Sequence, residues 1–299
     1  MDALVDSTRL LSDTRALRDR LAGDGYLFFR RLLPPETIMA TRTTVADQLR
    51  AGGWITQQGT ASGQPRATSG RDSWTDPAFR AAAASPAFNQ IPYLPPLRTL
   101  VRRLLGPRAF SYPVKVLRAV YPERQGRTLG RFTHYDYGVA GVQDMLTSWV
   151  PLMNIPVDVG GLAVRPGGHL GPPRRPRVLD VTQKGWATVN YEPGDAIVFH
   201  CLTPHAALPN NGNWLRLSGD FRWQRAEQPA PAELVFGPSG QDRELFSRLL
   251  HRQRWWEPVP DGLVLYPRSQ LVAAPPAPSS FFAVHPGWRR WKPPQGSVH

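Results

Sequence analysis

The stretch Arg131-Phe132-Thr133-His134-Tyr135-Asp136 holds an imidazole and a carboxylate with a single residue between them. Residues i and i+2 of an extended segment point to the same side, so His134 and Asp136 can approach one metal ion together. Two imidazoles and one carboxylate form the facial triad of non-haem Fe(II) sites, which leaves other coordination positions open. The stretch predicts a metal site, provided that the fold brings a second histidine to it.

Two downstream histidines compete for the third position, in the segment Phe199-His200-Cys201-Leu202-Thr203-Pro204-His205. His200 ends a predicted buried strand, whereas His205 lies on the turn that follows. Arg216 comes 11 residues after His205. We expect His205 to complete the triad because it lies nearer to the strand of Arg216. His200 is then a core histidine or a neighbour of the ligands.

Arg216 and Ser218 share one face of a predicted strand, so a guanidinium and a hydroxyl can converge on one ligand. A dianionic 2-oxo acid that chelates a metal has a far carboxylate that needs a buried cation. Arginine suits this role because its planar fork binds both oxygens, which a lysine cannot do. The alternative is a surface arginine on an alternating strand.

Short apolar segments separated by Gly and Pro turns dominate the middle of the chain, which has 32 Pro and 26 Gly in 299 residues. This pattern predicts a sandwich or barrel. Strands are expected at 25–30, 109–121, 146–155, within the run 160–169, 186–191, 196–201 and 214–224. Helical spacing predicts helices at 8–23, 34–49, 77–87 and 95–105. We expect one domain with a helical support region (1–107), a β core (108–226) and a C-terminal extension (227–299).

Three segments outside these elements carry weaker expectations. Residues 56–72 are rich in small polar residues and predict a surface loop, with a lid over a site as the alternative. Residues 241–251 predict a helix. The aromatic tail from Ala273 is expected to pack on the core or on a second subunit, which leaves a homodimer open.

The formal net charge of +13 favours anionic ligands or a nucleic acid. The arginines are spread along the chain and not gathered in a stripe, which argues against nucleic acid, and arginine richness also follows from a GC-rich genome. The single cysteine, Cys201, excludes an intramolecular disulfide and indicates a reducing cytoplasm. The chain has no secretory signal and no apolar run of membrane-spanning length.

Residues 109–225 resemble the phytanoyl-CoA dioxygenase family of Fe(II)/2-oxoglutarate oxygenases. Five segments carry the resemblance in family order: His134-x-Asp136, Trp149-Val150-Pro151-Leu152, the glycine-rich run 160–169 ending in His169, Pro193-Gly194-Asp195 running to His205, and Arg216-Leu217-Ser218. Gly168 stands where the family usually has Ser, a departure that touches no ligand.

The resemblance implies a double-stranded β-helix, mainly β with flanking helices. It implies that His134, Asp136 and His205 bind Fe(II), with 2-oxoglutarate and O2 at the open positions. It assigns the far carboxylate of 2-oxoglutarate to Arg216, supported by Ser218. Thr147 and Trp149 share one strand face and are weaker candidates to line the cosubstrate pocket, and His169 is more often structural in this family. A carboxylate at Asp136 argues for hydroxylation or another oxidation, because related halogenases have a small residue there.

Two alternatives stay open: a metal-binding barrel without turnover, and an oxygenase that acts on nucleic acid. The complete set of ligands with an arginine argues against the first. Five arginines flank the expected site and point to an anionic or polar small molecule: Arg131, Arg165, Arg174, Arg175 and Arg177. The run 170–177, which holds three of them, is equally well explained as a solvated loop. In a GC-rich bacterium, we expect a role in tailoring a secondary metabolite.

Overall fold

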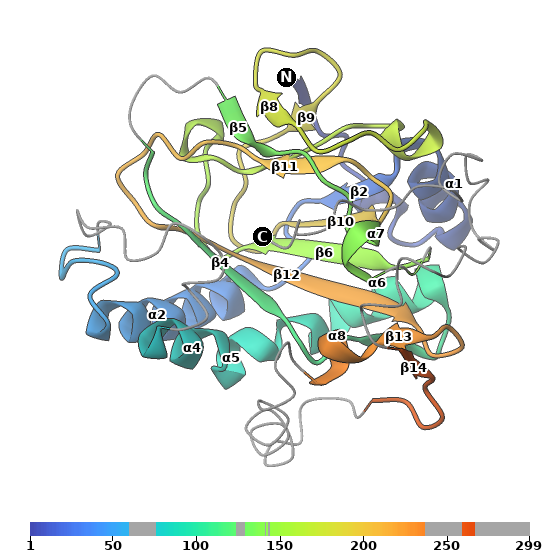
Figure 1. Cartoon of the computed structure of the whole chain (residues 1–299), viewed down its shortest axis with the longest axis horizontal. Helices are drawn as coiled ribbons and strands as arrows, with labels where there is room; N and C mark the ends of the chain where they lie inside the picture. The colour runs from blue at the N-terminus through green and yellow to red at the C-terminus, as the bar shows by residue number, and fades with distance from the viewer. Residues whose placement is uncertain (60–75, 124–128, 141, 143, 237–258, 267–299) are drawn as a thin grey trace.

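Two β-sheets face each other and form the core of the protein (Figure 1). The computed structural model describes the chain except for residues 60–75, 124–128, 141, 143, 237–258 and 267–299. The larger sheet has the strand order β2-β10-β6-β12-β3, with β4 also paired to β12, and the smaller sheet has the order β1-β9-β7-β11. This is a double-stranded β-helix, which confirms the predicted fold class.

The strands of both sheets are short, apart from β12. The larger sheet contains β2 (Tyr26–Phe29), β3 (Ala109–Ser111), β4 (Val116–Val120), β6 (Leu146–Pro151), β10 (Ala196–His200) and β12 (Arg216–Arg225). The smaller sheet contains β1 (Asp2–Ala3), β7 (Leu162–Val164), β9 (Ala187–Thr188) and β11 (His205–Ala207). Two further ladders join β5 (Leu129–Phe132) to β8 (Val178–Asp180), and β13 (Ala230–Pro231) to β14 (Leu265–Tyr266).

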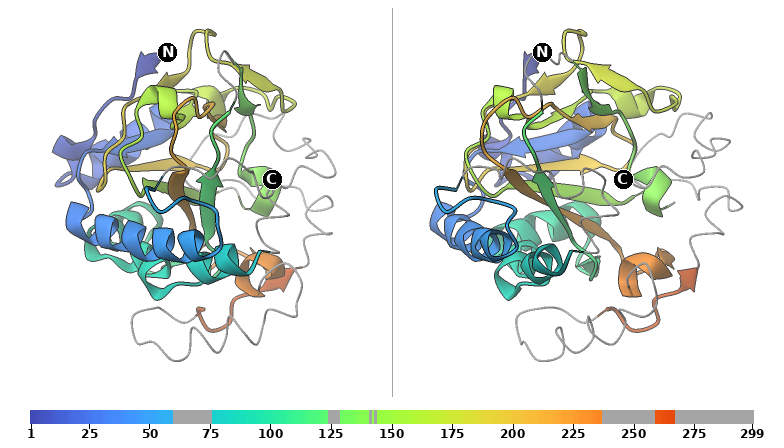
Figure 2. Two further views of the ribbon diagram at one scale, coloured as in Figure 1. Left: turned by 90° about the vertical axis from the view of Figure 1, so that its left-hand side faces the viewer. Right: turned by 60° about the vertical axis from the view of Figure 1, so that its left-hand side comes forward.

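Helices cover the outer face of the larger sheet. Figures 1 and 2 show α2, α4, α5 and α6 on the side of this sheet that faces away from the smaller one. The α-helices are α1 (Thr14–Asp24), α2 (Pro35–Ala51), α4 (Pro77–Ala83), α5 (Pro86–Asn89), α6 (Pro95–Leu105), α7 (Tyr137–Ala140) and α8 (Ala232–Phe236). Single 3-10 turns are η1 (Thr8–Leu10), η2 (Ile91–Tyr93), η3 (Val157–Val159) and η4 (Gly168–Leu170). Within the described residues, no helix is both long and apolar enough to cross a membrane.

The two faces of β12 have different chemistry, and this difference positions the site. Phe221 points outward and packs against Phe88 of α5, with ring centroids 5.3 Å apart. Arg216 points inward, since its guanidinium donates to the carbonyl of Gly160, next to the smaller sheet. Nine of the ten residues of β12 are buried. The polar residues at even positions therefore lie in the interior between the sheets, not on the surface.

Several predicted elements differ in detail. The strand at 109–121 is interrupted between β3 and β4 at Pro113, which has no N–H to donate to a ladder. The predicted strand 186–191 is only β9. The first helix begins at Thr14, where the Asp13 side chain accepts from the N–H of Ala16 at 3.0 Å. The helix at 77–87 is two helices, α4 and α5, because Ser85 caps the second.

Some predictions fall partly or wholly outside the described residues. These are the 56–72 loop beyond residue 59, the 241–251 helix and the aromatic tail. The described parts of the extension pack on the core: Ala230 and Val235 are buried in an apolar cluster with Tyr112 and Tyr137, and Val259 and Leu263 contact it. The division into support region, core and extension stays a prediction.

Candidate active site

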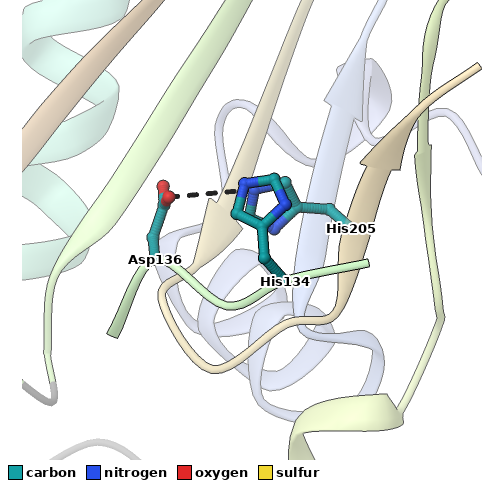
Figure 3. A group of neighbouring side chains, drawn as sticks. All are labelled: His134, Asp136 and His205. Atoms are coloured by element: carbon teal, nitrogen blue, oxygen red, sulfur yellow. Dashed lines mark ion pairs between the residues drawn. The ribbon is translucent and has the colours of Figure 1, made fainter. Parts of the chain in front are cut away.

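Three side chains from two distant segments meet between the sheets (Figure 3). His134 and Asp136 lie between β5 and α7, and His205 begins β11. The backbones of His134 and His205 exchange two hydrogen bonds, N to O, of 3.0 and 3.1 Å. This pairing places the two imidazole rings side by side, with centroids 4.1 Å apart. One nitrogen or oxygen atom from each of the three residues lies within 4.8 Å of the other two.

Both imidazoles are oriented by the carbonyl two residues before them. Nδ1 of His134 lies 3.2 Å from the carbonyl oxygen of Phe132, and Nδ1 of His205 lies 3.0 Å from that of Thr203. A ring whose Nδ1–H donates to a carbonyl has its Nε2 lone pair available for a metal. Nε2 of His205 lies 3.8 Å from Oδ1 of Asp136. The orientation of both rings therefore suits metal ligation.

Asp136 is buried and held by two side chains from the larger sheet. Arg222 donates from Nη2 to Oδ1 at 3.1 Å and from Nε to Oδ2 at 3.4 Å. The hydroxyl of Thr147 also donates to Oδ2. Burial alone would raise the pKa of Asp136, but the charge and hydrogen bonds of Arg222 outweigh it and hold this pKa well below its usual range. The group is therefore a carboxylate.

His134 is held in its neutral form. Desolvation, followed by the nearby His205, lowers the pKa of His134 to about 3. Metal ligation requires neutral imidazole and ionised carboxylate. Two nitrogens and one oxygen with three open positions suit ferrous iron in a facial triad. The donor set therefore fits the expected metal, and its chemistry agrees with the sequence analysis.

Arg216 is a buried cation whose surroundings favour an anion. Burial, together with the positive charges of Arg131 and Arg118, lowers its pKa to about 9. Among the described residues, no carboxylate forms a salt bridge with it, and its Nε has no hydrogen-bond partner. The hydroxyl of Ser218, on the same face of β12, is also buried and has no hydrogen-bond partner in the described part of the chain. Such unsatisfied donors are costly unless a ligand accepts from them.

The other residues named from the sequence occupy different places. Thr147, expected in the cosubstrate pocket, has its hydroxyl on Asp136. Trp149 is buried, with its ring centroid 4.7 Å from that of Tyr191. His200 lies outside the cluster, and its Nδ1 accepts from the N–H of Leu202 at 3.3 Å. Nε2 of His169 lies 2.9 Å from the carbonyl of Ala22, which ties η4 to α1.

Arg222 is the site residue that sequence reasoning missed. A signal was present, because Arg222 continues the inward alternation of Arg216 and Ser218 along one strand. Pairing it with Asp136, which lies 86 residues earlier, requires the register of β12 against β6.

The family model for phytanoyl-CoA dioxygenase (PhyH) matches residues 21–218 of this chain. The chain belongs to the phytanoyl-CoA dioxygenase family. The match includes the complete triad together with Arg216 and Ser218. This PhyH-family protein is a non-haem iron oxygenase, and iron and 2-oxoglutarate are the cofactor and cosubstrate that agree with its family and its donor set.

Curated relatives and solved structures agree with the family. The 1-deoxypentalenic acid 11-beta-hydroxylase of Streptomyces exfoliatus is 27% identical over 251 residues, which cover 74% of this chain and 85% of that protein. The Streptomyces arenae protein of the same name is 25% identical with the same coverage. A nickel complex of the non-haem monooxygenase ThoJ has the same fold, with a TM-score of 0.53 and 20% identity over 72% of this chain and 82% of that one.

Proposed function

We propose that this protein is an Fe(II)- and 2-oxoglutarate-dependent dioxygenase that hydroxylates a small carboxylic acid in bacterial secondary metabolism. One observation carries the proposal. A triad of His134, Asp136 and His205, with donor atoms within 4.8 Å, shares the interior with Arg216, a buried cation that forms no salt bridge with any carboxylate of the described residues. A structural barrel has no need for Arg216 in this place, because an uncompensated buried cation destabilises the fold.

Each of these side chains has a defined task. Iron, 2-oxoglutarate and O2 together supply the oxidant, while 2-oxoglutarate becomes succinate and carbon dioxide. His134, Asp136 and His205 would hold the metal and leave its remaining positions to the cosubstrate and O2. Arg216 binds the far carboxylate of 2-oxoglutarate through its guanidinium fork, and the Ser218 hydroxyl donates to the same group. Burial between the sheets excludes water, which strengthens these contacts.

The charge of the interior supports an anionic substrate. Arg118 on β4 and Arg216 and Arg222 on β12 are cations of the larger sheet. Arg118 pairs with Asp220 and Arg222 pairs with Asp136, whereas Arg216 forms no salt bridge with a described carboxylate. The charges of ferrous iron and dianionic 2-oxoglutarate cancel each other. The positive charge of these arginines favours an anionic substrate over a neutral one.

Arg118 is the cation best placed to meet such a substrate. Its Nε donates to Asp220 at 2.8 Å, and its side chain is 27% exposed, whereas Arg222 is only 6% exposed. Its charge also lowers the pKa of His134, so it lies near the metal site. The relatives named for 1-deoxypentalenic acid agree with this class, since that compound is a carboxylic acid.

Succinate formation tests the proposed reaction. The iron-loaded protein should convert 2-oxoglutarate to succinate, and His205→Ala should abolish the conversion. 1-Deoxypentalenic acid serves as the first substrate probe, with its uncharged methyl ester as the matched control. Stimulation by the acid and not by the ester supports the substrate class. Correctly folded, iron-loaded protein that forms no succinate contradicts the proposed reaction. We also place the enzyme in the cytoplasm, where its buried Cys201 stays reduced.

A further inference from the structure

We propose that Thr147 and Arg222 form a clamp that makes Asp136 bind the metal through a single oxygen. The inference rests on the proposed function, because it concerns the same metal site. It assigns to Thr147 a positioning role on a ligand, which differs from a place in the cosubstrate pocket. The clamp acts through hydrogen bonds to a residue that would touch the metal.

The two oxygens of Asp136 have different surroundings. Oδ1 faces the imidazoles, with Nε2 of His205 at 3.8 Å, and accepts one hydrogen bond from Nη2 of Arg222 at 3.1 Å. Oδ2 accepts from the Thr147 hydroxyl and also lies 3.4 Å from Nε of Arg222. Oδ2 is therefore occupied by two donors of the larger sheet, while Oδ1 points toward the position that a metal would take.

The register of the larger sheet builds this clamp. Thr147 of β6 lies directly opposite Arg222 of β12, and on its other side Phe199 of β10 lies opposite Thr147. Thr147 is fully buried in the middle of the sheet, and Arg222 is also buried. Both donors therefore stand on paired central strands, which hold them more firmly than a loop would.

A carboxylate with both oxygens free can bind a metal through either one or two of them. Binding through two would take a position that the cosubstrate or O2 needs. A donor on Oδ2 prevents this, because rotating the carboxylate toward the metal breaks the hydrogen bond from Thr147. The clamp thus preserves three open positions, and its loss changes both metal affinity and coordination geometry.

Thr147 offers a cleaner test than Arg222, since removing Arg222 leaves a buried carboxylate without its cation. Thr147→Val removes the hydroxyl and keeps the side-chain shape, and Thr147→Ser keeps the hydroxyl. Ser148→Ala is the matched control. It removes a buried hydroxyl from the adjacent position of β6, where Ser148 accepts from the indole N–H of Trp223 at 3.1 Å on the opposite face.

The experiment is an anaerobic titration of each full-length variant with Co(II), followed by its visible d–d absorption. We expect Thr147→Val to weaken Co(II) affinity by about 10- to 100-fold and to change the absorption spectrum. Thr147→Ser should restore both readouts, and Ser148→Ala should leave both as in the wild type. Thermal unfolding of every variant checks that the fold is kept, and Thr147→Ala, with the same expected result, replaces Thr147→Val should the latter fail to fold.

A hydroxyl-free variant with the affinity and spectrum of the wild type would overturn the clamp. Equal losses in Thr147→Val and Thr147→Ser would overturn it as well, because the hydroxyl would then be irrelevant. A different result tests the proposed function itself: wild-type protein that binds no Co(II), or binding that survives His205→Ala, contradicts the metal site and not merely its clamp.

Discussion

Replacing Arg216 with methionine should weaken 2-oxoglutarate binding and at the same time stabilise the ligand-free protein. Methionine keeps much of the side-chain volume and removes the charge and the donors. In the native protein, this buried guanidinium donates to the Gly160 carbonyl but forms no salt bridge with a described carboxylate. If Arg216 instead stabilised the fold, replacing it with methionine would destabilise the ligand-free protein.

The loss of affinity follows from removing one partner of a buried charge pair, which costs about 2–5 kcal/mol. A central value of about 3 kcal/mol corresponds to roughly 100-fold weaker binding of 2-oxoglutarate. Arg216→Lys should recover only part of this, because an ammonium group lacks the planar fork. Isothermal titration of the Co(II)-loaded protein with 2-oxoglutarate under anaerobic conditions measures each affinity.

The gain in stability follows from the lowered pKa of Arg216. Burial lowers this pKa from 12.5 to about 9, so the unfolded chain binds the proton more readily than the folded protein does. The penalty is therefore fully present below about pH 9 and is relieved as the pH rises toward 12.5. Removing the charge should stabilise the free protein by roughly 1–3 kcal/mol at pH 7.5, after the loss of the Gly160 contact.

Denaturant unfolding at pH 7.5, without metal or cosubstrate, measures that gain. Arg225→Met is the control, since it removes a cation from the end of the same strand. It should leave 2-oxoglutarate affinity unchanged. Native 2-oxoglutarate affinity in Arg216→Met would refute the assignment of this residue, and a large loss of stability without ligand would show that its charge is compensated within the fold.

Three further predictions concern the surroundings of the site. Gly25→Ala should destabilise the protein by roughly 2–4 kcal/mol in thermal unfolding. The φ angle of Gly25 is +79°, and a new Cβ would lie 2.5 Å from Nδ1 of His169 and 2.7 Å from Oγ1 of Thr203. An unchanged melting temperature would contradict this prediction. Lys115→Met should stabilise the protein by about 1–3 kcal/mol at pH 7, since burial lowers the pKa of Lys115 from 10.5 to about 7. The native protein loses stability as the pH falls from 10.5 to 7, because only the unfolded chain then binds the proton. A gain from Lys115→Met as large at pH 10.5 as at pH 7 would show that the buried charge is not its cause. His200→Gln should keep one equivalent of Co(II) in a metal titration, because His200 lies outside the cluster; loss of the metal would make it a ligand.

Local spacing made much of the site predictable. His134 and Asp136 are two residues apart and share a side of an extended segment, and Arg216 and Ser218 do the same on β12. These relations depend only on the period of an extended chain. The choice of His205 over His200 agrees with the geometry, because His205 pairs with His134 and His200 ends β10.

The contacts that depend on strand register could not be read in this way. The pairing of Arg222 with Thr147 across β12 and β6 decides what surrounds Asp136, and no local pattern gives that register. The break in the strand at Pro113 could have been predicted from the sequence, because proline has no N–H to donate within a ladder. The β-branched and aromatic residues on both sides nevertheless favoured one long strand.

The proposed enzyme binds one iron and one 2-oxoglutarate at His134, Asp136 and His205. Visible absorption of the anaerobic protein tests this binding most directly, because a metal-to-ligand charge-transfer band requires 2-oxoglutarate bound to ferrous iron. We predict a band that appears only when Fe(II) and 2-oxoglutarate are both present, that is kept in His200→Gln and that is lost in His205→Ala. Folded, iron-loaded protein without the band, or a band that persists in His205→Ala, would contradict the account.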